Sequence, residues 1–130
     1  MQTLYERTVE VGKMENVIVL FEVTVKKGKM EDYMKMAAGL MDALSQAEGL
    51  IRSERFSSLA VEDKLLSMSV WEDEASVERW RNLAAHRMCQ KNGRMHDFAD
   101  YTITVVAPKR TYSMTQRKGA PEDSNRFLEV

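Results

Sequence analysis

Cysteine, charge of one sign and long apolar runs are all scarce in this sequence, and each scarcity excludes a class of protein. The chain of 130 residues has one cysteine, Cys89, so no internal disulfide can form and a reducing, cytoplasmic location is expected. Its 19 basic and 20 acidic side chains leave a formal net charge of −1, which favours neither nucleic acid nor an anionic membrane as partner. The longest apolar run, residues 17–21, is far too short to cross a bilayer.

Two common families of catalytic motif are missing as well. The sequence contains no G-x-G-x-x-G phosphate loop and no G-x-S-x-G nucleophile elbow. His86 and Cys89 fall on adjacent turns of one expected helix, and His96 and Asp97 follow, but no second pair of cysteines supports a metal site. Nothing local marks Cys89 as an activated nucleophile, so neither a metal ion nor a catalytic thiol is expected.

What is present fits one globular domain. Hydrophobic residues make up 44% and charged residues 30%, an ordinary composition for a chain that buries a core. We expect an N-terminal extension over residues 1–14, a domain over residues 15–112 and a polar tail over residues 113–130. The N-terminal segment lacks an apolar signal core, so secretion is not expected.

Hydrophobic periodicity predicts the elements of that domain. The strongest signal is a strand over residues 16–26, which alternates Val17, Val19, Phe21, Val23 and Val25 and is apolar on both faces, as a central strand is. The other expected elements are a helix over 29–47, strands over 50–58 and 65–71, a helix over 74–92 and a strand over 101–107. This order predicts an α+β fold of the ferredoxin-like, split βαβ type, an antiparallel sheet with two helices on one face.

Such a sheet leaves one face without helices. Neither set of alternating side chains on the central strands is polar enough to remain in water. A second copy that covers the open face is the economical solution, so the sequence predicts a homodimer.

The most informative stretch runs from Trp71 to Tyr101. Asp73 is the expected N-cap of the second helix, and Gly93 is its expected stop. The aromatic and polar side chains that can ring one cavity are Trp71, Trp80, His86, Arg94, Phe98 and Tyr101. A cavity with mostly apolar walls and a few polar groups suits a flat hydrophobic ligand. The alternatives are that Trp80 only anchors its helix in the core and that His86 lies at the surface or at a dimer contact.

This stretch resembles the antibiotic biosynthesis monooxygenase family of dimeric α+β barrel proteins. The matching residues are Trp71-Glu72-Asp73-Glu74-Ala75, Trp80-Arg81, His86-Arg87, Gln90, Gly93-Arg94 and Phe98-Ala99-Asp100-Tyr101, within a resemblance that spans residues 16–112. It implies the ferredoxin-like fold, a homodimer through facing sheets, and a pocket between sheet and helices in each subunit.

The resemblance also implies an activity, a cofactor-independent monooxygenase that acts on a small aromatic or quinol-type substrate. Trp71, Trp80, Phe98 and Tyr101 would then shape the substrate pocket. The catalytic candidates are His86 and Arg94, which would stabilise a phenolate or move its proton. Neither a cofactor nor a metal is expected on this interpretation.

Two other interpretations stay open. Haem-degrading members of the family carry an asparagine on the first strand, a tryptophan on the second helix and a histidine ten residues later. In this chain those positions hold Phe21, Trp80 and Gln90, so the tryptophan alone matches, although His86 lies one helical turn before Gln90. A dimeric ligand-binding stress protein without turnover is the third interpretation, because fold alone does not decide function.

Overall fold

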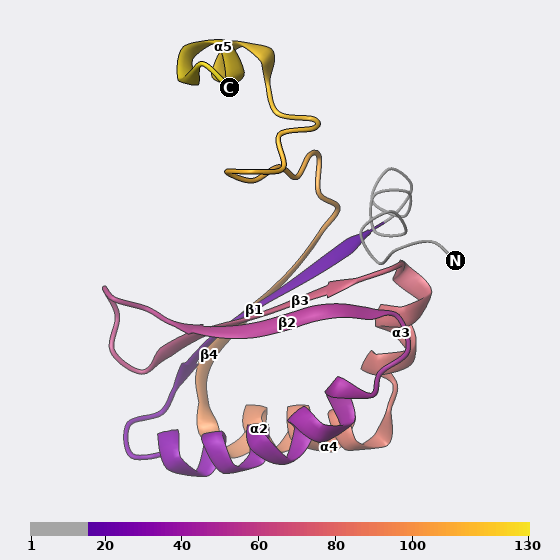
Figure 1. Ribbon diagram of the computed structural model, residues 1–130. Coiled ribbons are helices and arrows are strands. Elements are labelled where there is room, and N and C mark those ends of the chain that lie inside the picture. Colours follow the sequence, from indigo (N-terminus) through magenta and orange to yellow (C-terminus); the bar gives the residue numbers. More distant parts are fainter. Residues whose placement is uncertain (1–15) are drawn as a thin grey trace.

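The computed structural model describes residues 16–130, and the expected N-terminal extension, residues 1–14, lies outside the described part. Four strands form one antiparallel sheet in the order β2-β3-β1-β4: β1 (Val17–Val25), β2 (Leu50–Ser57), β3 (Lys64–Trp71) and β4 (Phe98–Val106). The helices are α2 (Met30–Ser45), α3 (Glu74–Arg81), α4 (Ala84–Asn92) and α5 (Glu122–Leu128), with a π-helical turn, η1 (Gly93–Asp97), before β4. Helices α2 and α4 lie on the same face of the sheet (Figure 1). The ferredoxin-like α+β fold is confirmed.

Strand β1 lies in the middle of the fold, between β3 and β4, as its two apolar faces predict. Its odd-numbered side chains point toward the helices, where Val23 and Val25 form a core with Tyr33 and Phe98. A second core joins Val17, Trp71 and Val77 at the other end of the sheet. A cavity lies between these two packed regions and is lined by side chains from both.

The second helix of the prediction is two helices. Helix α3 ends at Arg81, and α4 begins at Ala84. Leu83 between them has an extended backbone (φ −66°, ψ 135°), so the expectation of one continuous helix over residues 74–92 is wrong. Across this break the ring centroids of Trp80 on α3 and His86 on α4 lie 5.3 Å apart.

Gly93 does not stop the helix, which corrects a second expectation. Its backbone is right-handed helical (φ −59°, ψ −49°), and the chain continues through η1 into β4, which begins at Phe98 rather than at Tyr101. A Cβ at position 93 would lie 2.2 Å from the ring of Phe98. Glycine is required here because an aromatic ring lies directly against the backbone.

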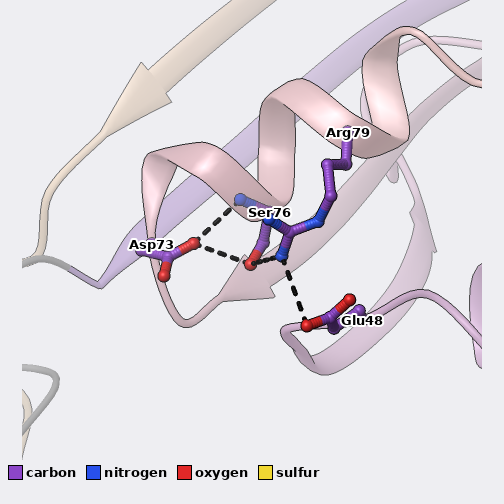
Figure 2. Close-up of polar contacts among 4 residues, drawn as sticks. All are labelled: Glu48, Asp73, Ser76 and Arg79. Carbon is purple, nitrogen blue, oxygen red and sulfur yellow. Dashed lines mark hydrogen bonds and ion pairs between the residues drawn. The ribbon is translucent and has the colours of Figure 1, made fainter.

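Asp73 is the N-cap of α3, as predicted (Figure 2). Its Oδ1 accepts hydrogen bonds from the backbone N–H of Ser76 (2.8 Å) and from Ser76 Oγ (2.7 Å). These two bonds lower the pKa of the Asp73 carboxyl. Arg79 donates to Ser76 Oγ (3.1 Å) and lies 3.9 Å from the carboxylate of Glu48, so the start of α3 is fixed to the segment that enters β2.

The C-terminal segment is not a featureless polar tail. It contains α5, and Arg117 holds it together by donating to Asn125 Oδ1 (3.0 Å) and Ser124 Oγ (3.3 Å). The segment extends away from the sheet on the side opposite to α2 and α4 (Figure 1). Helix α5 buries none of its residues, and Phe127 is 85% exposed. No helix within residues 16–130 is both long and apolar enough to cross a membrane.

The sheet face opposite the helices carries apolar side chains at its centre. The strand registers place Leu20 of β1 beside Met68 of β3, with Leu66 two residues away on the same face. All three are only half-buried. Polar groups surround them, among them the ion pair of Glu22 with Lys64 (3.6 Å).

Candidate functional site

The central feature of the site is a cavity of about 240 Å³ between the sheet and helices α2, α3 and α4. Most of its wall is apolar, as small-molecule sites are. The sheet contributes Val19, Phe21, Arg55, Ser67, Ser69, Trp71, Phe98, Ile103 and Val105. The helices contribute Tyr33, Met36, Ala37, Leu40, Met41, Leu44, Val77, Trp80, Arg81, His86, Cys89 and Gln90.

Four of the six predicted site residues line this cavity: Trp71, Trp80, His86 and Phe98. The other two, Arg94 and Tyr101, are not among the residues that line it, although the ring of Tyr101 packs against those of Phe21 and Phe98. Arg94 is exposed and donates to Tyr101 Oη (2.6 Å), and both residues line a shallow depression beside Asp100. Phe98 contributes to both surfaces.

Three rings form one wall of the cavity. Trp71 is fully buried, and its ring centroid lies 6.2 Å from that of Trp80, which in turn contacts His86. Trp71 Nε1 donates to Ser69 Oγ (2.8 Å), so its polar group is already satisfied. Trp80, which is half-buried, therefore offers a ligand its ring surface, which suits a flat apolar partner, and Trp71 supports it from the core.

Partial burial favours the neutral form of His86. Desolvation lowers the pKa of the imidazole, the hydrogen bond with the Arg81 carbonyl acts against this, and the charges of Arg87 and Arg81 add to the lowering. Nδ1 lies 3.3 Å from the carbonyl oxygen of Arg81, which can only accept, so Nδ1 carries the hydrogen. The neutral ring then keeps the lone pair of Nε2, and a neutral imidazole at the wall of a cavity can take a proton from a bound ligand.

Arg55 and Tyr33 belong to the cavity but were missed from the sequence. Arg55 extends from β2, and its Nη1 is buried without a hydrogen-bond partner in residues 16–130. Burial raises the pKa of the Tyr33 phenol, and the neighbouring Arg55 guanidinium acts against that rise. A signal existed: Arg52 and Glu54 share one face of the strand by alternation, and Arg55 falls on the other. The three charges together, Arg52, Glu54 and Arg55, instead indicate an exposed edge strand of the sheet.

Metal-binding groups do not gather in the described part of the chain. Within residues 16–130, no three His, Cys, Asp or Glu side chains lie close enough to hold a metal ion. Phe21 and Gln90, at the positions where the haem-degrading pattern has asparagine and histidine, both line the cavity. Among the described residues, His86 is the histidine that lines this cavity.

The sequence is similar to that of known proteins. The family model described as antibiotic biosynthesis monooxygenase matches residues 16–92. A protein of Pyricularia oryzae named jasmonate monooxygenase ABM is 36% identical over 87 residues, which are 67% of this chain and 40% of the relative. The chain thus spans less than half the length of that relative.

Solved structures agree on the fold. A conserved protein from Methanosarcina mazei superposes with a TM-score of 0.70 at 18% identity, over 77% of this chain and 99% of the other. SnoaB from Streptomyces nogalater, a cofactor-independent oxygenase, superposes with a TM-score of 0.65 at 12% identity, over 75% of this chain and 96% of SnoaB. At these identities the likeness shows the fold alone. The family model and the fungal relative show more: the chain belongs to the antibiotic biosynthesis monooxygenase family.

Proposed function

We propose that this protein is a cofactor-independent monooxygenase that oxidises a small phenolic or quinol-type ring bound between the sheet and the helices. The observation that carries the proposal is a neutral imidazole, His86, beside two tryptophan rings in a mostly apolar cavity. Membership of a monooxygenase family supports the reaction type. The likeness to a cofactor-independent oxygenase supports chemistry in which the substrate supplies the electrons.

The reaction balances without a bound redox group when the substrate is an acidic CH₂ next to a phenolic ring. His86 Nε2 takes one proton from that carbon, and the resulting carbanion, delocalised over the ring, reduces O₂ and forms a C–O bond. The hydroperoxide then loses its remaining C–H proton and its outer oxygen as water. One oxygen atom stays as a carbonyl, and the four electrons that reduce O₂ come from the two C–H bonds.

Each residue has a physical role in this proposal. Trp80 and Phe98 hold the ring flat and exclude water, and the buried Trp71 fixes the position of Trp80. His86 is the base, since its lowered pKa keeps it unprotonated at neutral pH. We assign no chemical step to Arg94 or Tyr101, whose side chains bond to each other outside the cavity.

We propose also that a second copy of the chain covers the open sheet face. Leu20, Leu66 and Met68 supply the apolar centre of that face. The exposed apolar side chains of the C-terminal segment, Met114 and Phe127, offer further surface for the same partner. A reducing, cytoplasmic location is part of the proposal, and the unpaired thiol of Cys89 is consistent with it.

Oxygen uptake tests the activity. The probes are dithranol, which carries an acidic CH₂ between phenolic rings, and menadiol, a quinol, each corrected for its spontaneous oxidation. We expect uptake by the wild-type protein, and a loss of about 100-fold or more in His86→Ala, which is typical when a general base is removed. His96→Ala is the matched control because His96 is exposed and does not line the cavity. Equal rates in His86→Ala and the wild type would refute the role of His86.

Haemin titration separates this proposal from the haem-degrading interpretation. We expect no saturable Soret band on adding haemin to the wild-type protein. Saturable binding of one haem per chain that disappears in His86→Ala would instead make His86 an axial ligand and would overturn the cofactor-free mechanism.

A further inference from the structure

A cation lies in the cavity without a counter-ion among the described residues. Arg55 Nη1 is buried and has no hydrogen-bond partner there. An unpaired buried guanidinium is costly, so such groups normally meet a carboxylate or another acceptor. Tyr33 is the neighbour that interacts with Arg55, through a side-chain hydrogen bond as well as through the charge. Burial nevertheless raises the pKa of the Tyr33 phenol, so the neutral phenol leaves the charge of the guanidinium without a counter-ion.

The guanidinium has a defined place in the cavity. Arg55 lies opposite Ser67 of β3, and Ser67 lies opposite Phe21 of β1, so all three share the helix-facing side of the sheet. Trp71 is four residues further along β3, about 13 Å away at about 3.3 Å per residue. The guanidinium lies beside Tyr33, which belongs to the core of Val23, Val25 and Phe98, whereas Trp71 belongs to the core at the other end of the sheet.

The charges within the cavity differ between its two ends. His86 is neutral because burial lowers its pKa, and Arg81, although part of the lining, is an exposed residue. Arg55 is half-buried, but its Nη1 is fully buried and has no hydrogen-bond partner in the described part of the chain. The Ser67 hydroxyl beside it is a second group that can donate a hydrogen bond.

We infer that Arg55, with Ser67 and Tyr33 beside it, is a carboxylate-binding subsite. The natural ligand would then be a ring compound with two ends: a carbon that reaches His86 and, away from it, a carboxylate that binds Arg55. A planar guanidinium matches a carboxylate with two parallel hydrogen bonds. A single arginine fits one carboxylate better than a phosphate, which needs more donors. The cavity volume of about 240 Å³ limits the rest of the ligand to a small ring system.

This inference rests on the proposal that the cavity is the substrate site, but its test needs no turnover. The probes are 2-naphthoate and its neutral counterpart 2-naphthamide, titrated calorimetrically into the full-length chain. The wild-type protein should bind the acid about tenfold or more tightly than the amide, as expected for a charge-assisted pair in a buried site.

The variants assign that preference to one side chain. Arg55→Met, which keeps the length of the side chain without its charge, should reduce the preference to about one while the amide still binds. Arg52→Met is the matched control because Arg52 lies on the same strand but on the opposite face, opposite Val70. It should keep the wild-type preference. If Arg55→Met fails to fold, as judged by circular dichroism, Arg55→Gln replaces it.

Three results would overturn the inference: no binding of either probe, no preference in the wild type, or a preference that persists in Arg55→Met. The outcome is separable from that of the proposed function. A preference that depends on Arg55, without oxygen uptake from dithranol or from a dithranol that carries a carboxyl group, refutes the oxygenase alone. Oxygen uptake without the preference refutes the carboxylate subsite alone.

Discussion

At the scale of single residues, the surroundings of a side chain decide its chemistry more than its type does. His86 and His96 lie ten residues apart, but only His86 lines the cavity. Its imidazole contacts the ring of Trp80, and its Nδ1 bonds to the Arg81 carbonyl. The same burial that lowers its pKa keeps the ring unprotonated at neutral pH, so that it is free to accept a proton.

This burial predicts how stability depends on pH. The pKa of His86 in the folded state lies below its ordinary value of 6.5, so the unfolded chain binds the proton first as the pH falls. The stability that the neutral ring contributes is therefore complete above about pH 6.5 and is lost as the pH falls through that value toward the folded-state pKa.

Urea unfolding curves measure this loss. The free energy of unfolding should fall more between about pH 7.5 and about pH 5.5 in the wild type than in His86→Gln. The Asp73 carboxyl, whose pKa is lowered by Ser76, loses its contribution only at lower pH, as it is protonated below 3.8. Equal pH dependence in the two proteins would show that His86 is not desolvated in the folded chain.

At the scale of elements, two glycines with helical backbones differ in the space around them. Gly39 lies within α2 with nothing within 4 Å of a Cβ added to it, whereas a Cβ at Gly93 would meet the ring of Phe98 at 2.2 Å. Glycine in an open helical position is unfavourable because it loses more backbone entropy on folding than alanine does.

The two alanine substitutions should therefore change stability in opposite directions. Gly39→Ala should raise the free energy of unfolding by about 0.5–1 kcal/mol. Gly93→Ala should lower it by about 1–3 kcal/mol, the range for overpacking, because the ring must move. Phe98→Leu in the Gly93→Ala background should recover part of that loss. A stabilised Gly93→Ala protein would contradict the packing of Phe98 against this backbone.

The elements also show how far the sequence determines the structure. Alternation and turn residues predict all four strands and the N-cap Asp73, because these signals are local. The break after Arg81 has no such signal, since the run from Leu83 to Met88 continues with good helix formers. The inward orientation of Arg55 depends on the register of β2 against β3, including the irregularity between Leu50 and Arg52. Pairing between strands fixes that register, and a single-strand pattern does not contain it.

At the scale of the whole molecule, the open sheet face is the surface that most needs a partner. A dimer through this face should be disrupted by Met68→Glu, because Met68 lies beside Leu20 at the apolar centre and a buried carboxylate would be unpaired. Light scattering after size-exclusion chromatography should give the monomer mass for Met68→Glu and the dimer mass for the wild type.

The control for this prediction is Met34→Glu on α2. Met34 is 41% exposed and does not line the cavity, so the same charge there should leave the mass unchanged. A monomeric wild type, or a Met68→Glu protein with the mass of the wild type, would refute the dimer through this face.

We propose that the molecule as a whole oxidises a substrate in this cavity with O₂ and without a bound cofactor. The most direct measurement is mass spectrometry of the product formed from dithranol under ¹⁸O₂, with protein that has been treated with chelator and shows no haem or flavin absorbance. We expect one ¹⁸O atom in the product carbonyl and the other in water, at a rate that depends on His86. Turnover that appears only after haemin, flavin or a metal ion is added would contradict it.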